Sequence, residues 1–123
     1  MLQQIGLVAL GGAIGAALRY SIGTWVSYDT FPLATIIVNL LGSFLLGIIT
    51  LSLTHNMISA DLALFLGTGI LCAFTTMSAF SIETVELLQS GNSSTAGLYV
   101  LSTLILCPVF AWLGWLIADK GLA

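Results

Sequence analysis

Charged side chains are scarce in this sequence of 123 residues, making up only 6% of it, with two basic and five acidic residues. A soluble domain carries about 25% charged residues, so the composition excludes an ordinary soluble domain. No connector is long enough to hold a separate catalytic domain. We therefore expect a single domain, residues 1–123, and no nucleic-acid partner.

The residue types of common catalytic and metal sites are equally sparse. The only histidine, His55, stands in a connector, where we expect it to be solvated, so no Ser-His-Asp set is plausible. No cluster of His, Cys, Asp and Glu has metal-ligand spacing. Cys72 and Cys107 fall within apolar segments without CxxC-type spacing, which favours buried, inert thiols over a disulfide or a metal pair. The sequence therefore does not predict an enzyme.

Apolar residues, in contrast, are abundant, at 59% of the sequence. A membrane-spanning helix needs about 20 mainly apolar residues. Four segments meet this requirement: Gln4–Val26, Phe31–Leu53, Asp61–Leu88 and Ala96–Ala118. The first segment lacks the basic start of a signal peptide and is interpreted as a retained helix. The predicted fold is an all-α membrane protein with four transmembrane helices.

The two basic residues, Arg19 and Lys120, are placed almost symmetrically. With an even number of spans, both termini lie on one side of the membrane and the first connector lies on the other. The two positive charges then fall at opposite faces, so the positive-inside bias is close to zero. Such a chain can insert in both orientations, and we infer dual topology and an antiparallel dimer.

The first predicted helix carries small residues four apart, Gly11 with Gly15 and Gly12 with Ala16, which allow helices to approach closely. They suit packing within a subunit and a dimer interface equally well. Arg19 ends this apolar run. Its side chain either extends to the lipid headgroups or points inward and creates a positive field at a pore mouth.

The third segment is predicted to be broken near its middle, where hydroxyl residues gather between Thr75 and Ser81. Its 28 residues would form a straight helix of roughly 42 Å, which is too long for one span. Neither Gly nor Pro lies between Thr75 and Ser81, so the break must come from hydroxyl groups that compete for backbone hydrogen bonds. Glu83 and Glu86 follow, as functional carboxylates or as solvated residues at a helix end.

Polar residues also occur inside the second and fourth helices. Asn39 is either an interhelical hydrogen-bonding residue or an N–H donor to an anion. Tyr99, Thr103 and Cys107 are four apart and form one stripe, and Pro108 kinks the helix or frees a carbonyl.

A polar path through the membrane would thus be lined by neutral donors, namely Asn39, Ser78, Ser81, Tyr99 and Thr103. Large anions call for rings of Arg or Lys and cations call for rings of Asp or Glu, and neither ring can be built here. The path suits a small anion or a neutral solute. The positive edges of Phe rings can add to anion coordination.

Three motifs, in order and over nearly the whole chain, resemble the Fluc/CrcB family of fluoride channels. They are Gly11-Gly12-x-x-Gly15-Ala16-x-x-Arg19-Tyr20, then Thr35-x-x-Val38-Asn39-x-x-Gly42-Ser43-Phe44-x-x-Gly47, and then Thr75-Thr76-Met77-Ser78-Ala79-Phe80-Ser81-x-Glu83. The resemblance implies an antiparallel dual-topology dimer in the inner or plasma membrane of a bacterial-type cell. It also implies two fluoride pathways, a central structural sodium ion, and passive export of fluoride from the cytoplasm.

The resemblance assigns roles to individual residues. The implied fluoride pathway comprises Asn39 as a donor, Phe80 as a ring edge, Met77, Ser78 and Ser81 around the break, and Tyr99 and Thr103 on the fourth helix. Arg19 stands at the vestibule position, and the backbone carbonyls of Cys72 and Thr75 stand at the sodium-ligand positions.

The sequence departs from the family pattern around the break. Met77 replaces a usual Phe, Ala79 replaces a usual Thr, and Cys72-Ala73 replaces a Gly pair, while Ala34 replaces a Gly before the second motif. A second hypothesis is therefore a non-conducting or partner subunit of a heterodimer with a paralogous chain. A third is a small multidrug-type transporter, although that mechanism needs a carboxylate in the first helix and none precedes Asp29.

Overall fold

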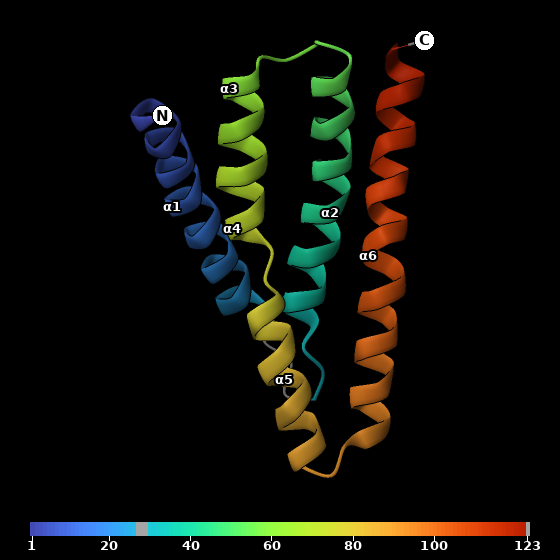
Figure 1. Cartoon of the computed structure of the whole chain (residues 1–123). Helices are drawn as coiled ribbons and strands as arrows, with labels where there is room; N and C mark the ends of the chain where they lie inside the picture. The colour runs from blue at the N-terminus through green and yellow to red at the C-terminus, as the bar shows by residue number, and fades with distance from the viewer. Residues whose placement is uncertain (27–29, 123) are drawn as a thin grey trace.

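The computed structural model describes residues 1–26 and 30–122, and in them the chain is helical with short connectors (Figure 1). The helices are α1 (Leu2–Trp25), α2 (Leu33–Thr54), α3 (Ala60–Ala63), the π-helix η1 (Leu64–Leu71), α4 (Cys72–Phe74), α5 (Met77–Gln89) and α6 (Ser93–Leu122). The connector expected at residues 27–29 lies outside the described residues.

Within the described residues, four helical stretches are long and apolar enough to span a membrane: Leu2–Trp25, Leu33–Thr54, Ala60–Gln89 and Ser93–Gly121. This confirms the four predicted spans, with ends that differ by a few residues from the expected ones. The surface of these helices is apolar, as shown by Leu10, Leu101 and Trp112, which are 65%, 58% and 60% exposed. Apolar side chains in such numbers on the surface match a lipid environment.

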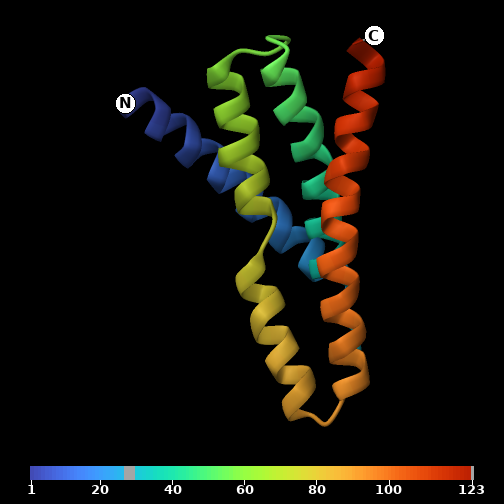
Figure 2. The ribbon, with the colours of Figure 1, turned by 45° about the vertical axis from the view of Figure 1, so that its right-hand side comes forward.

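The helices form one layered bundle. In Figures 1 and 2, α2 runs beside the C-terminal half of α6, α5 runs beside its N-terminal half, and α1 crosses η1 and α4 obliquely. The N-terminus and the end of α6 lie at the same end of the bundle, as an even number of spans requires.

Glycines permit the closest of these contacts. A Cβ atom at Gly11 or Gly15 would collide with backbone carbonyls of η1, those of Phe65 and Ile70, whereas Gly12 has open space around it. On the other side of the bundle, a Cβ at Gly47 would collide with the backbone of α6. The small residues Gly11 and Gly15 therefore pack helices within the subunit.

The third span is interrupted where α4 meets α5. Thr75 has ψ of 159° and Thr76 has φ of −153° and ψ of 118°, so both residues are extended. The ribbon shows two helical halves joined by this short extended segment (Figure 2). Thr76 Oγ1 accepts a hydrogen bond from the Ala79 N–H at 3.1 Å and thereby caps α5. A side-chain hydroxyl thus replaces a backbone acceptor at this point.

Candidate ion pathway

Asn39 of α2 holds the extended segment in place. Its Oδ1 accepts from the Thr76 N–H at 2.7 Å, and its Nδ2 donates to the Thr76 carbonyl at 3.1 Å. The Asn39 side chain is buried, with 8% exposure, and it bonds both backbone groups of Thr76, whose N–H has no acceptor in the helices. The amide keeps a second N–H that this pair does not use.

The hydrogen bonds at the extended segment also change which backbone carbonyls are paired around the two predicted sodium-ligand positions, Cys72 and Thr75. In a continuous helix, the N–H groups of Thr76 and Ala79 would donate to the carbonyls of Cys72 and Thr75, four residues earlier. Here they donate to the side chains of Asn39 and Thr76 instead. The carbonyls of Cys72 and Thr75 are therefore released from their helical partners. Their oxygens are of the type that alkali cations bind in broken transmembrane helices.

The Cys72 thiol does not match the sequence expectation. We predicted a buried thiol, but the Cys72 side chain is exposed on the chain surface. The reason is the orientation of α4, which buries Phe74, at 5% exposure, two residues further on and on a different side of the helix. Cys107 is partly exposed.

Arg19 points inward. Its Nε donates to the carbonyl of Ala73 at 3.1 Å, near the end of the first half of the broken span. A guanidinium at this position complements the negative end of a helix. Of the two alternatives for Arg19, the structure therefore supports the inward one, with the positive charge beside the break.

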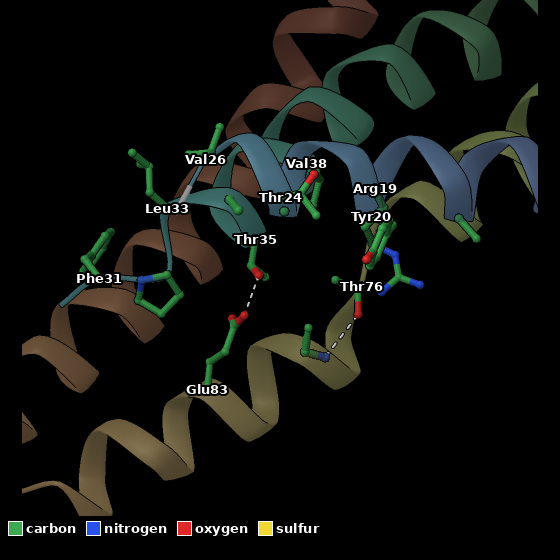
Figure 3. A pocket seen from close by; sticks show the side chains of 15 residues that line it. Arg19, Tyr20, Thr24, Val26, Phe31, Leu33, Thr35, Val38, Thr76 and Glu83 are labelled. Atoms are coloured by element: carbon green, nitrogen blue, oxygen red, sulfur yellow. Dashed lines mark hydrogen bonds between the residues drawn. The ribbon is translucent and has the colours of Figure 1, made fainter. Parts of the chain in front are cut away.

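A first cavity of about 500 Å³ opens between α1, α2 and α5 (Figure 3). Arg19, Thr35, Thr76 and Glu83 contribute its polar lining. Thr35 Oγ1 donates to Glu83 Oε1 at 2.7 Å, and the figure shows the two side chains pointing toward one another. The cavity thus contains a carboxylate at one place and a guanidinium at another.

Glu83 also links this cavity to α6, because its Oε2 accepts from the Tyr99 hydroxyl at 2.5 Å. Tyr99 is fully buried, with the rings of Phe31 and Phe80 at centroid distances of 5.8 and 5.1 Å. The sequence left Glu83 undecided and assigned Thr35 no role. A signal was present, since Glu83 lies three residues after Phe80 and so shares its face of α5.

A second cavity of about 330 Å³ lies on the other side of the extended segment. Asn39, Thr76, Met77, Thr103 and Cys107 are among its lining residues. Thr103 Oγ1 is buried and has no hydrogen-bond partner within the described part of the chain. Thr103 thus borders the cavity while its hydroxyl oxygen is itself buried away from the open space.

The remaining predicted pathway residues of α5 lie outside both cavities. Ser78 Oγ contacts Thr76 Oγ1 at 3.1 Å, and Ser81 Oγ donates to the Met77 carbonyl at 2.8 Å. Both serines are exposed on the chain surface, and Met77 is 66% exposed. Phe80 contacts Tyr99 but lines neither cavity. Of the predicted pathway residues, Asn39, Met77 and Thr103 therefore line one cavity, whereas Ser78 and Ser81 lie on an exposed face of α5.

Residues 6–115 match the family model described as CrcB-like protein, Camphor Resistance (CrcB). The chain belongs to the CrcB family. A relative from Thermus thermophilus, named fluoride-specific ion channel FluC, is 45% identical over 89% of this chain and 88% of its own length. A FluC from Oceanobacillus iheyensis is 41% identical over 92% of this chain and 89% of its own. Fluoride-specific ion channel FluC 2 of Bacillus subtilis is 50% identical over 87% of this chain and 81% of its own length.

These relatives confirm the resemblance that the motifs predicted. Their names describe ion channels, so this CrcB-family chain belongs to a class of proteins that are not enzymes. With four helices capable of crossing a membrane, it is a multi-pass integral protein of the plasma membrane. Within residues 1–26 and 30–122, no group of three or more His, Cys, Asp and Glu could hold a metal ion.

Proposed function

We propose that this chain is a passive fluoride channel that lets fluoride leave the cytoplasm down its gradient. The observation that carries the proposal is the position of Thr76, which lines both cavities and lies at the break between α4 and α5. We propose that the two cavities on either side of it belong to one route past the interruption, with Thr76 as the residue that they share. The names of the relatives support fluoride as the ion.

The donors along the route suit a small, strongly hydrated anion. Asn39 and Thr103 both line the second cavity, and the Asn39 amide keeps one N–H that its pairing with Thr76 does not use. Such groups replace water around fluoride without the charged rings that would also attract larger ions. Arg19 contributes a positive charge to the first cavity beside the break, and the Glu83 carboxylate in the same cavity accepts hydrogen bonds from Thr35 and Tyr99.

The working unit that we propose is an antiparallel dual-topology dimer with two pathways. Ser78, Ser81 and Met77 are exposed on α5, inside a span that would otherwise face lipid. Hydroxyl groups are unfavourable next to hydrocarbon, and a second subunit on this face would cover them. Arg19 and Lys120 lie at opposite membrane faces, so the positive-inside bias is close to zero, and this supports insertion in both orientations.

A structural sodium ion fits the break and is part of the proposal. The carbonyls of Cys72 and Thr75 have lost their helical donors, and neutral carbonyl oxygens suit a hard monovalent cation. When bound, sodium would supply a positive charge that holds the ends of two half-helices together. Asn39 contributes to the same arrangement by keeping the Thr76 N–H away from the Cys72 carbonyl.

The decisive experiment is fluoride efflux from liposomes that contain only this purified chain, measured with a fluoride electrode. Efflux that needs no proton gradient supports the homodimeric channel. Absence of efflux, restored by a paralogous chain, would instead support the partner-subunit hypothesis, which the departures at Met77 and Ala79 from the family pattern suggested. Proton-coupled uptake of a cationic dye would contradict both and indicate a small multidrug-type transporter.

A further inference from the structure

Arg19 is the only arginine in the sequence, and its side chain joins α1 to the break in the third span. Its Nε donates to the Ala73 carbonyl at 3.1 Å, and the residue is half-buried. Ala73 lies in α4 between Cys72, whose carbonyl is a predicted sodium ligand, and Phe74, where α4 ends. The guanidinium therefore bonds the backbone directly before the interruption.

The Ala73 carbonyl needs this donor because the break removes its helical one. In a continuous helix, the carbonyl would accept from the N–H of Met77, four residues later. The extended residues Thr75 and Thr76 carry Met77 into the next helix, α5. Arg19 Nε takes the role of the lost N–H, and a charged donor forms a stronger hydrogen bond than a neutral amide. Its positive charge also offsets the partial negative charge at the end of this half-helix.

The packing of α1 brings Arg19 within reach of Ala73. α1 and the first half of the third span run in the same direction (Figure 1). Gly15 lies so close to the backbone of Ile70 that a Cβ atom would collide with it. Arg19 and Ala73 each lie about one helical turn beyond that contact. The hydrogen bond therefore continues the interface that the glycine makes possible.

We propose that Arg19 is a positioning residue of the ion route, and that its role is to hold the end of α4 in place through Ala73. Fixing this carbonyl also fixes the backbone on either side of it, with the Cys72 carbonyl before it and the extended segment after it. Asn39 holds that segment through Thr76. One side chain from α1 and one from α2 thus hold the break. The effect on fluoride passage rests on the proposed function, whereas the hydrogen bond does not.

The hydrogen bond can be measured in the unmodified chain, because the sequence has one arginine and two Ala-Phe pairs, Ala73-Phe74 and Ala79-Phe80. Solid-state NMR of the full chain in lipid, with ¹⁵N at the arginine Nε and ¹³C at the alanine carbonyls, measures the through-space coupling between them. A second sample with ¹⁵N-phenylalanine assigns the two carbonyl signals. We expect coupling from Arg19 Nε to the Ala73 carbonyl and none to the Ala79 carbonyl, which lies within α5. Absence of the Ala73 coupling would overturn the proposal.

Two substitutions separate the hydrogen bond from the charge. Arg19→Gln removes the charge but keeps an N–H donor, because the glutamine Nε2 is bonded to Cδ as the arginine Nε is. Arg19→Met removes both. Lys120→Met is the matched control, since it removes the other basic charge, at the exposed end of α6, and changes the positive-inside bias by the same amount. We expect the Ala73 carbonyl signal to move in Arg19→Met alone, with Ala79 constant throughout. An unmoved Ala73 signal in Arg19→Met would overturn the capping role.

The second arm measures fluoride efflux from liposomes, with size-exclusion elution at the wild-type volume as the check on folding. We expect efflux to fall about tenfold in Arg19→Met, as the loss of a hydrogen bond from a charged donor implies, and to stay within a few-fold of wild type in Arg19→Gln and Lys120→Met. Efflux that falls equally in Arg19→Gln and Arg19→Met, while Arg19→Gln keeps the Ala73 signal, would show that the charge matters and overturn the positioning role. A wild-type chain with the Ala73 coupling but without efflux would contradict the proposed channel and leave the hydrogen bond supported, so the two failures are distinguishable.

Discussion

Replacing Asn39 by Asp changes the side chain that forms two hydrogen bonds with the backbone of Thr76 at the break. The carboxylate keeps an acceptor for the Thr76 N–H at 2.7 Å but has no hydrogen to donate to the Thr76 carbonyl at 3.1 Å. Losing this hydrogen bond costs about 0.5–1.5 kcal/mol, since the Thr76 carbonyl at the start of α5 still accepts the first helical hydrogen bond. The substitution therefore weakens the geometry of the break as well as its charge balance.

The added charge has the larger effect on fluoride. A fluoride ion about 4 Å from the carboxylate is repelled by about 4 kcal/mol at an effective dielectric constant of about 20. Since about 1.4 kcal/mol corresponds to a factor of ten, we expect efflux to fall by about a thousandfold. The measurement is electrode-detected efflux from liposomes containing the variant.

A matched control makes the result interpretable. Asn56→Asp introduces the same charge in the exposed connector after α2, outside both cavities, and should leave efflux near the wild-type rate. If Asn39→Asp retained efflux within a few-fold of wild type while eluting as folded protein, Asn39 would not lie on the route, and the reasoning would be refuted.

Three further substitutions test the packing and the lining. Gly15→Ala should destabilise the chain by about 1–3 kcal/mol in thermal unfolding, because its Cβ would strike a backbone carbonyl of η1, whereas Gly12→Ala meets nothing within 4 Å and should be neutral. Met77→Phe should preserve or raise efflux, and a loss of efflux with intact assembly would show that the route is tuned to the thioether. Tyr99→Phe removes the hydrogen bond to Glu83, worth about 1.5–3 kcal/mol, and should lower both stability and efflux; unchanged values would mean that this bond is not needed.

The interrupted third span shows how far local sequence reasoning extends. Its excess length and its hydroxyl residues pointed to the region between Thr75 and Ser81, and in the structure the two extended residues are Thr75 and Thr76. The sequence could not select these two residues, because the choice depends on Asn39, which is 37 positions away from Thr76. A hydrogen bond between two helices has no local signature.

Glu83 is a residue whose role the sequence left undecided. As a carboxylate close to a polar loop, it suited a solvated helix end. In the fold it accepts from Thr35 of α2 and from Tyr99 of α6 at once. The half-helix α5 leaves the break in a direction that brings Glu83 between those two helices, and that direction is a property of the tertiary structure.

The sequence by itself determined that this protein is a helical membrane protein with four spans, and its motifs indicated the family. Hydropathy and motif spacing are properties of the sequence itself, so they can be determined without knowledge of the fold. Only the tertiary structure decided which polar groups meet. It paired Asn39 with Thr76, and it placed Met77 and Cys107 in one cavity. The physical reason is that helix packing and the offset at the break, rather than sequence distance, set which side chains converge inside the bundle.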